Sequence, residues 1–362
     1  MKPLAGIKVL DFSDYLAGPS SALKLADLGA RVLKIESPAG EGGRMLTVPG
    51  SEIEGISPLF CAVNRSKEGK RLDLNTEAGQ AEARALIKDA DAVIFSRDTE
   101  IPLLTYETVR KWNPLIIYGE VSGYGLKGAW SKKPAHDLLA QCLTGLPYLN
   151  GNADEAPIPL GLPVAELFAG QHLAQGVMAA LIRRQKKQTG ACIQVSLAES
   201  VLDIQFEVFS TFLNDGHQSP QRCEVNNANA YINAPYGVYE TKEGYIALAL
   251  CSIPVLGEVL GCKELLAYTD EVEWATKRDQ IKAILKEYLK RETAAFWMEK
   301  LEAADIWGAK VLNWSDLEKT GGFQVLEMVQ SIKRNGKEMF KTTRCPISIN
   351  KERFYCDKEF TV

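Results

Sequence analysis

One carboxylate of the chain, Glu166, stands where an irregular segment gives way to an apolar helical pattern. The segment PLGLPVAELFAGQHLAQGVMAAL (159–181) places Gly161 and Pro163 before this residue and Gly170 after it. A carboxylate in the first turn of a helix gains about 0.3–1 kcal/mol from the helix macrodipole. A helix-start role therefore explains Glu166 on local grounds, and a chemical role requires support from the rest of the chain.

Histidine and cysteine are too sparse or too scattered in this sequence to predict a metal site. The chain contains three histidines and eight cysteines, without a C-x-x-C pair or a Cys/His cluster at zinc spacing. The histidines are His136, His172 and His217. We expect no metal, and we interpret the cysteines as reduced thiols of a cytoplasmic enzyme.

The composition is that of a globular protein of about two domains. The chain has 362 residues, of which 46% are hydrophobic and 24% are charged, and its net charge is -4. This charge balance favours neither nucleic acid nor an anionic membrane as a partner. Residues 1–4 lack the apolar core of a signal peptide, and no apolar run approaches the length of a membrane span.

The elements that must position Glu166 begin as an alternation of strands and helices. Residues 7–12 and 31–36 have the apolar pattern of strands, and residues 18–30 between them have helical spacing. This βαβ unit suggests nucleotide binding, but its turn, LAGPSSA, lacks the G-x-G-x-x-G fingerprint. The alternation continues and predicts an α/β layer with a mostly parallel sheet. Further helices are expected at 77–89, 105–112, 165–187 and 196–213, and further strands at 91–96 and 115–121.

The chain changes character after residue 213. Residues 214–233 are polar and rich in Asn, which predicts a linker. A hairpin-like pair of strands follows at 236–250, and helical patterns occupy 271–290 and 293–304. The tail, which includes EMFKTTRCPISI, is rich in β-forming residues.

Several stretches, in order along nearly the whole chain, resemble class III CoA-transferases. The longest is PLAGIKVLDFSDYLAGPSSALKLADLGARVLKIESPAGEGGR (3–44). The others are NRSKEGKRLDLNTEAGQ (64–80), ADAVI (90–94), YETVRKWNPLIIYGEVSGYG (106–125), PAHDLLAQCLTGL (134–146), the segment at 159–181, RRQKKQTGACIQVSLAESVLD (183–203), PYGVYETKEGYIAL (235–248) and TTRCPISI (342–349). This family includes formyl-CoA:oxalate and carnitine CoA-transferases, and it has α-methylacyl-CoA racemases as relatives.

The resemblance implies a fold of two parts. A Rossmann-like large α/β domain is expected over 1–213, completed by 325–362. Residues 214–233 would link it to a smaller inserted α+β domain over 234–324. In this family two chains form interlocked rings, so the resemblance also implies an interlocked homodimer.

The resemblance gives Glu166 a chemical role, because an Asp of the transferases occupies this position. That Asp attacks the thioester of an acyl-CoA, and covalent intermediates then pass coenzyme A to a second, small carboxylic acid. Glu in place of Asp moves the carboxylate oxygens by one methylene, and a misplacement of about 1 Å costs on the order of 10²-fold in rate. A catalytically silent CoA-binding homologue is therefore one alternative.

His136 carries a second alternative. In the racemase branch a His in the motif that resembles AHDLLAQ moves the α-proton of the acyl-CoA, and Asp137 beside it would orient the ring or be only a loop acid. The racemases have a Glu in the stretch that resembles LCSIPVL (250–256), where this chain has Ile253. That difference favours a transferase over a racemase or epimerase of 2-substituted acyl-CoAs.

The resemblance also implies the residues that bind coenzyme A. The turn YLAGP (15–19) matches the active-site turn of the family, with Leu16, where some members have Gln, followed by Ala17. Cations and hydrogen-bond donors suit phosphates, although each of them alone is also typical of a solvated surface. The set expected near the nucleotide part is Arg44, Asn64, Arg65, Lys67 and, within FSRDTEIPLL (95–104), Arg97.

Overall fold

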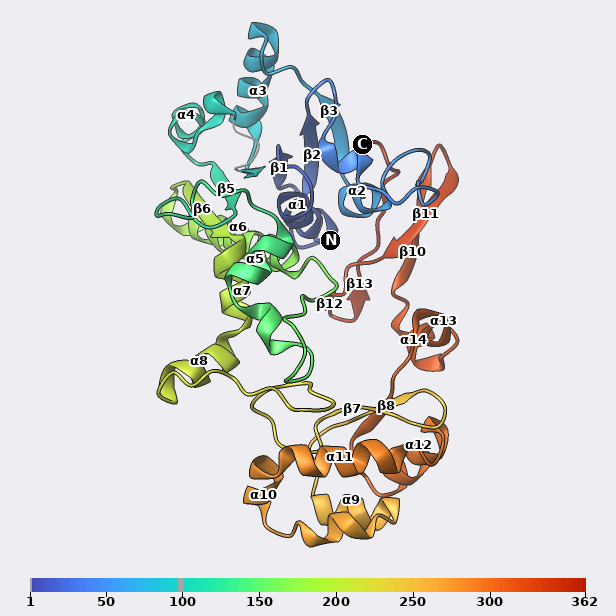
Figure 1. Cartoon of the computed structure of the whole chain (residues 1–362). Helices are drawn as coiled ribbons and strands as arrows, with labels where there is room; N and C mark the ends of the chain where they lie inside the picture. Colours follow the sequence, from blue (N-terminus) through green and yellow to red (C-terminus); the bar gives the residue numbers. More distant parts are fainter. Residues whose placement is uncertain (1, 97–100) are drawn as a thin grey trace. The chain divides into compact units, whose positions relative to one another are not determined.

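The structure, a computed structural model, describes residues 2–96 and 101–362 and divides into two compact units (Figure 1). The first unit comprises Met1–Gln141, Pro163–Asp203 and Gly322–Val362, so both terminal segments belong to it. The second unit comprises Cys142–Leu162 and Ile204–Gly321. It therefore begins earlier in the chain than the small domain that the sequence predicts.

The expected linker, 214–233, is a packed part of the second unit. The guanidinium of Arg278 donates to the carbonyl oxygen of Ala230 at 2.6 Å, and the Lys282 ammonium donates to that of Asn226 at 3.0 Å. A segment rich in polar side chains predicts a solvated linker, because its polar groups can find hydrogen-bond partners in water. Here cations of a neighbouring helix supply those partners in place of water.

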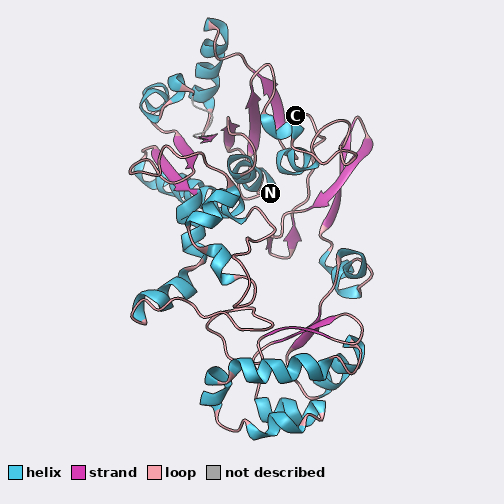
Figure 2. Cartoon of the chain, viewed as in Figure 1, coloured by secondary structure: helices cyan, strands magenta, loops and turns pink. Residues whose placement is uncertain are grey.

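A six-stranded sheet organises the first unit (Figure 2). All five strand pairings are parallel, as the alternation of strands and helices predicts. The strand order reverses between β1 and β4, which makes a topological switch point there. In spatial order the strands are β3 (Glu68–Arg71), β2 (Arg31–Glu36), β1 (Lys8–Asp11), β4 (Ala92–Ser96), β5 (Ile117–Ser122) and β6 (Ala191–Ser196).

Helices cover both faces of this sheet, as successive residues of β5 show. Tyr118 belongs to an apolar cluster with Ala83 of α3 (Glu77–Asp89) and Val109 of α4 (Tyr106–Trp112). The next residue, Gly119, faces α6 (Val164–Lys187), because a Cβ there would lie 3.0 Å from Leu173. Helix α6 also packs on α1 (Ala17–Asp27). The predicted α/β class is confirmed.

Two predicted helices are each broken into a pair. The pattern at 196–213 forms α7 (Leu197–Ile204) and α8 (Phe206–Asn214), which part at Gln205, whose side chain donates to the Thr144 carbonyl. The pattern at 271–290 forms α10 (Glu271–Thr276) and α11 (Arg278–Leu289), which part at Lys277. In both places a continuous apolar periodicity hides a local turn. Helices α2 (Pro58–Asn64) and α5 (Asp137–Leu143) are additions that the periodicity does not predict.

The second unit has a core of its own. A cluster of buried side chains that includes Tyr239, Ile246, Leu285 and Trp297 lies between helices and a small antiparallel sheet. The strands are β7 (Gly237–Glu240), β8 (Tyr245–Leu248) and β9 (Gly308–Lys310), and the remaining helices are α9 (Ile253–Leu260), α12 (Ala294–Ala303) and α13 (Trp314–Leu317).

The C-terminal tail belongs to the first unit and is rich in β structure, as predicted. Phe340 and Phe360 pack there with Phe60 of α2, which attaches the tail to the N-terminal half of the unit. Helix α14 (Gly321–Leu326) leads into the tail, which starts at Gly322. The tail then forms the hairpin of β10 (Val329–Arg334) and β11 (Lys337–Thr343) and the antiparallel pair of β12 (Ser348–Ile349) and β13 (Glu352–Arg353).

None of the helices in the described residues combines the length and the apolarity that crossing a membrane requires. The same residues contain no group of three or more His, Cys, Asp or Glu side chains that could hold a metal ion.

Candidate active site

A cavity of about 660 Å³ opens at the carboxyl ends of β1, β4 and β5. Asp14 follows β1, Ser96 ends β4 and Ser122 ends β5, so the cavity lies at the switch point of the sheet. Open α/β sheets bind ligands at such points. Most of the other walls are apolar, from Leu16, Leu46, Leu59, Val121, Pro134, Ala135, Pro163 and Leu197.

Glu166 borders this cavity where three helices begin. Ala17 is the first residue of α1, Asp137 is the first of α5, and Glu166 lies in the first turn of α6. The backbone N–H groups of Ala17 and Asp137 both donate to the Glu166 carboxylate. N–H groups at helix starts have no partner within the helix, and the macrodipole there favours negative charge. These two donors therefore favour an anionic oxygen at Glu166.

Asp137 holds the beginning of α6 in place. Its Oδ1 accepts a hydrogen bond from the Glu166 N–H at 3.1 Å, and its Oδ2 accepts one from Gln141 Nε2 at 2.7 Å. The side chain is buried and acts as a cap on a helix to which it does not belong. Sequence reasoning offered Asp137 as a catalytic partner of His136 or as a loop acid, and the capping role was missed.

The pKa of the Glu166 carboxyl is raised above its usual value. Burial is the largest cause, and the negative charge of Asp137 acts in the same direction. The electrostatic interaction with His136 and the N–H groups of Ala17 and Asp137 oppose the rise. Glu166 is thus a carboxyl that is partly desolvated yet still provided with donors for its ionised form.

His136 also lines the cavity, and its side chain is exposed. Because its charge lowers the pKa of Glu166, the two side chains lie within electrostatic range of each other. The structure therefore brings together the three residues that the sequence predicts as catalytic, Glu166, His136 and Asp137, at one cavity. Leu16 and Ala17, predicted as contacts of coenzyme A, line it as well.

Two glycines allow the walls to approach each other this closely. A Cβ at Gly170 would lie 2.6 Å from the carbonyl oxygen of Ala17, so the glycine lets α6 touch α1 one turn beyond Glu166. A Cβ at Gly123 would lie 2.3 Å from the Cβ of Ala135, so this glycine lets the segment before His136 lie against the end of β5. Sequence reasoning singled out Gly170 but not Gly123, whose position two residues after a predicted strand was the available signal.

The other residues predicted to bind coenzyme A have partners within the protein. Arg44 forms a bidentate pair with Glu36, with distances of 2.6 and 2.7 Å. The Arg65 guanidinium lies 2.7 Å from a carboxylate oxygen of Asp27, and both side chains are buried. These pairs place both guanidiniums on carboxylates rather than in open solvent.

Lys67 and Asn64 are also buried, and they bond to each other at 2.8 Å. The Lys67 ammonium lies 2.8 Å from Asp11, with 0% of either side chain exposed. A solvated surface role, the alternative for each of these groups, is thus excluded for Lys67 and Asn64. Arg97, the last residue of the predicted set, lies outside the described residues.

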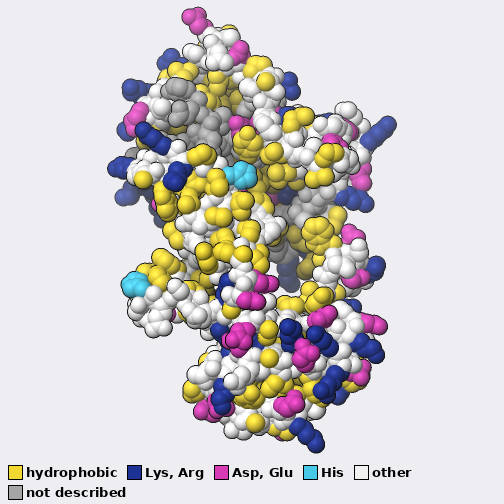
Figure 3. Space-filling view, in the orientation of Figure 1, with side chains coloured by type: hydrophobic (Ala, Val, Ile, Leu, Met, Phe, Trp, Pro, Cys, Tyr) yellow, Lys and Arg dark blue, Asp and Glu magenta, His cyan; other side chains and the backbone are white. Residues whose placement is uncertain are grey.

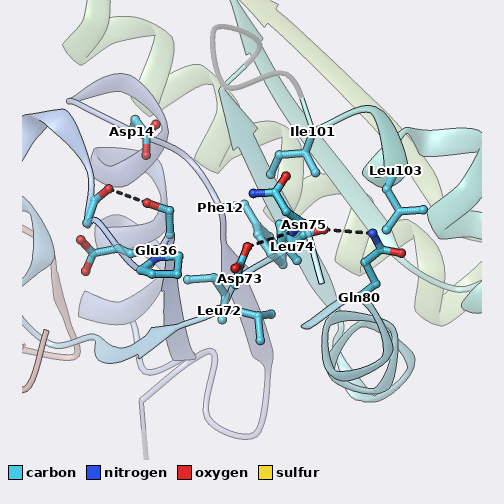
Figure 4. A pocket seen from close by; sticks show the side chains of 14 residues that line it. Phe12, Asp14, Glu36, Leu72, Asp73, Leu74, Asn75, Gln80, Ile101 and Leu103 are labelled. Atoms are coloured by element: carbon cyan, nitrogen blue, oxygen red, sulfur yellow. Dashed lines mark hydrogen bonds between the residues drawn. The ribbon is translucent and has the colours of Figure 1, made fainter. Parts of the chain in front are cut away.

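A second cavity, of about 510 Å³, follows the carboxyl ends of β1, β2 and β3 (Figure 4). Asp14 borders both cavities, which makes them neighbours. The segment after β3 forms one wall, where Gln80 Nε2 donates to the Leu74 carbonyl at 3.0 Å and the Asn75 N–H donates to Asp73 at 3.0 Å. These bonds fix the wall in the orientation seen in Figure 4.

Comparisons with known proteins identify the family. The family model of CoA-transferase family III matches residues 4–358. A succinate–glutarate CoA-transferase of Agrobacterium fabrum is 30% identical over 302 residues, which cover 80% of this chain and 74% of that protein. An acetyl-CoA:oxalate CoA-transferase of Acetobacter aceti is 29% identical over 314 residues, with coverages of 84% and 79%.

Solved structures show the same fold. The crystal structure of a CAIB/BAIF family protein from Brucella suis matches with a TM-score of 0.86 and 27% identity over 99% of this chain and 95% of that one. The family model covers nearly the whole chain, and the relatives are named as CoA-transferases. The chain therefore belongs to CoA-transferase family III, as its motifs predict, and it is a transferase enzyme.

Proposed function

We propose that this enzyme moves coenzyme A from an acyl-CoA thioester to a small carboxylic acid, with Glu166 as the nucleophile. The observation that supports this most is the position of the Glu166 carboxylate, at the edge of the cavity and bonded to the backbone N–H groups of Ala17 and Asp137. A nucleophilic carboxylate must be ionised and held in a fixed orientation, and these two donors serve both needs.

The proposed reaction has four acyl exchanges. A Glu166 oxygen attacks the thioester carbonyl carbon, the C–S bond breaks, and coenzyme A leaves as a thiolate, which leaves a mixed anhydride on the enzyme. The thiolate then attacks the Glu166 carbonyl and releases the first carboxylate, which gives a glutamyl-CoA thioester. The acceptor carboxylate attacks the carbonyl carbon of this thioester, the C–S bond breaks, and a second mixed anhydride forms as the thiolate leaves. The thiolate then attacks the acceptor carbonyl of that anhydride, which gives the acceptor acyl-CoA and frees the Glu166 carboxylate. Each step exchanges one acyl bond for another, which is the advantage of covalent catalysis.

The second cavity is where we propose that the nucleotide part of coenzyme A binds. It borders the first cavity at Asp14 and lies along the carboxyl ends of three parallel strands, the edge at which such sheets bind nucleotides. We propose that Leu16 and Ala17 contact the thioester end and that Arg97 contacts phosphate. The other predicted contacts of coenzyme A bond to groups of the protein instead, and we propose that they stabilise the segments that form the site. They are Arg44, Asn64, Arg65 and Lys67.

Mass spectrometry after chemical trapping tests this function. The enzyme is incubated with a panel of acyl-CoA thioesters, treated with hydroxylamine or borohydride, and digested. A mass change on the peptide that contains Glu166, absent in the Glu166→Gln variant, is expected. Binding of acyl-CoA without any adduct or turnover would instead identify a catalytically silent CoA-binding protein.

A racemase or epimerase is the second candidate, because His136 borders the same cavity as Glu166. Against it, Ile253 is wholly buried in the core of the second unit, and an apolar side chain cannot supply the second proton donor. Incorporation of solvent deuterium at the α-carbon of a 2-substituted acyl-CoA, without a carboxylate acceptor, would favour the racemase. Its loss in His136→Ala would assign the proton transfer.

We also propose a homodimer. Hydrophobic side chains gather on the surface over α5 and α7 (Figure 3), and they include Leu138, Leu139 and Leu202. In the second unit α8 exposes Phe206 and Phe209. Contiguous exposed apolar patches mark protein interfaces. Sedimentation is expected to give a dimer at micromolar concentration, and a well-folded monomer there would contradict the proposal.

A further inference from the structure

The turn that carries Ala17 is held in a strained conformation. It runs from Ser13, after β1, to Pro19 in the first turn of α1. Tyr15 within it has a φ of 63°, in the left-handed region that side chains other than glycine rarely adopt. Such a conformation persists only where several contacts of the surrounding structure hold it in place.

Two buried ammonium groups bind the two ends of this turn. Lys34 Nζ donates to the Ser13 carbonyl oxygen and lies 2.6 Å from the Glu41 carboxylate. Lys67 Nζ donates to the Pro19 carbonyl oxygen at 2.9 Å and lies 2.8 Å from the Asp11 carboxylate.

Further contacts fix the beginning of the turn. Asp11 Oδ1 accepts hydrogen bonds from the N–H and the hydroxyl of Ser13, so the carboxylate that binds Lys67 also binds the turn. A Cβ at Gly18 would lie 2.2 Å from Ser13, which shows how tightly the turn closes on itself. The turn is therefore held at both ends and from within. We call the two end contacts, Lys34 on Ser13 and Lys67 on Pro19, the clamps of the turn.

The burial of these charges needs an explanation other than stability. Lys34, Lys67 and Asp11 each have 0% of the residue exposed. Burying an ion pair costs about as much desolvation energy as its attraction returns, and apolar side chains of similar volume often stabilise a core better. A lysine can, however, bind a carboxylate and a backbone carbonyl at once, which an apolar side chain cannot do.

We propose that Lys34 and Lys67 are positioning residues for the transfer reaction, acting through the Ser13–Pro19 turn on the Ala17 N–H that binds Glu166. This inference rests on the proposed nucleophilic role of Glu166. It assigns Lys67 to the geometry of the nucleophile rather than to a contact with coenzyme A. The two ammonium groups fix the carbonyls at the ends of the turn, and the strained residue between them keeps the Ala17 N–H directed at the Glu166 carboxylate.

The double variant Lys34→Met/Glu41→Gln tests the proposal, because it removes one clamp without leaving an unpaired buried charge. We expect kcat to fall at least tenfold while the Kd for coenzyme A changes less than twofold. Because the Ala17 N–H lowers the pKa of Glu166, its loss is also expected to move the acidic limb of the pH–kcat profile to higher pH. A merely structural role would leave that limb in place.

The matched control is Arg184→Met/Asp91→Asn, which removes a partly buried ion pair of the same unit away from the turn. It is expected to keep kcat and the pH profile. Gly18→Ala displaces the same turn without touching a lysine, so it is expected to reproduce the loss of kcat and the pH shift. It keeps the test available if the lysine variant does not fold.

Three results would overturn the proposal. One is a folded Lys34→Met/Glu41→Gln enzyme with the parental kcat, and another is a raised Kd for coenzyme A with kcat unchanged. The third is parental amide hydrogen exchange in the peptide 12–20 of the variant. Exchange does not depend on catalysis, so faster exchange there supports the clamp even if the parent enzyme gives no Glu166 adduct. Faster exchange in the variant, together with no Glu166 adduct in the parent enzyme, would reject the nucleophile and leave the clamp standing.

Discussion

Replacing Gly170 by alanine tests whether the contact between α1 and α6 sets the geometry at Glu166. Gly170 lies one turn beyond Glu166, and a Cβ there would lie 2.1 Å from Ser20 Oγ and 2.6 Å from the Ala17 carbonyl oxygen. The Ser20 hydroxyl can rotate away at the cost of its 2.9 Å bond to that carbonyl. The backbone of Ala17 has no such freedom, so the two helices must separate.

The size of that separation gives the expected effect. Ordinary van der Waals contact begins at 3.4 Å, so the Ala17 carbonyl must move by about 0.8 Å. The N–H of the same residue donates to Glu166 and moves with it. A misplacement of about 1 Å costs on the order of 10²-fold in rate, so we expect kcat to fall by about 10- to 100-fold. Overpacking costs about 1–3 kcal/mol of stability, from which the helix propensity of alanine recovers up to about 1 kcal/mol.

Initial rates of CoA transfer at saturating substrates, together with thermal unfolding, measure the two effects separately. Gly176→Ala is the matched control on the same helix, because its Cβ would lie 2.6 Å from Ile193 of β6 and not near Ala17. We expect it to destabilise the fold and to keep kcat. A Gly170→Ala enzyme with the parental kcat, or a Gly176→Ala enzyme that loses as much, would refute the reasoning.

Glu166→Gln keeps the size of the side chain and removes the proposed nucleophile, so transfer should fall by at least about 10³-fold while coenzyme A still binds; isothermal titration beside the rate assay checks both. Glu166→Asp should lose activity if the pocket is adapted to Glu, and a gain would show that Glu is the inferior residue. Folding raises the pKa of Glu166, which means that the folded protein accommodates the neutral carboxyl better than the carboxylate. The contribution of Glu166 to stability is therefore complete below the usual pKa of 4.5 and is lost as pH rises through the pKa of the carboxyl in the folded protein. Glu166→Gln should therefore unfold at a higher temperature than the parent at about pH 8 and show no such advantage at about pH 4, and equal melting temperatures at both would contradict the raised pKa. Arg65→Ala leaves Asp27 buried without its ion-pair partner, which costs about 3–5 kcal/mol; denaturant unfolding should show this loss, and a Kd for coenzyme A that rises tenfold with unchanged stability would restore Arg65 as a ligand contact.

Local patterns in the sequence predict the family and many of the elements, but not β3, β6, α2 or α5. Strand 31–36 and helix 77–89 have the bounds that periodicity predicts, because apolar spacing and the helix-capping Thr76 are local signals. The motifs from 3–44 to 342–349 identified the family, and they drew attention to Glu166, whose position at the start of a helix is also encoded locally.

The partners of the buried charged residues appear only in the folded structure. Arg65 and Lys67 stand in a motif that also suits phosphate binding, and nothing local shows that Asp27 and Asp11 lie opposite them. Asp11 within the predicted strand 7–12 and Lys34 within 31–36 were the available signals, since a charge in a central strand of a parallel sheet must have a buried partner.

The site itself depends on contacts between distant segments. The donors to Glu166 come from Ala17 and Asp137, and the cap of α6 comes from the side chain of Asp137. Likewise the polar segment 214–233 is packed because Arg278 and Lys282 lie beside it. Local patterns report which face of an element is buried, whereas the partner of a buried polar group is fixed only when the chain closes on itself. This is why the sequence singled out Glu166 but not the groups that surround it.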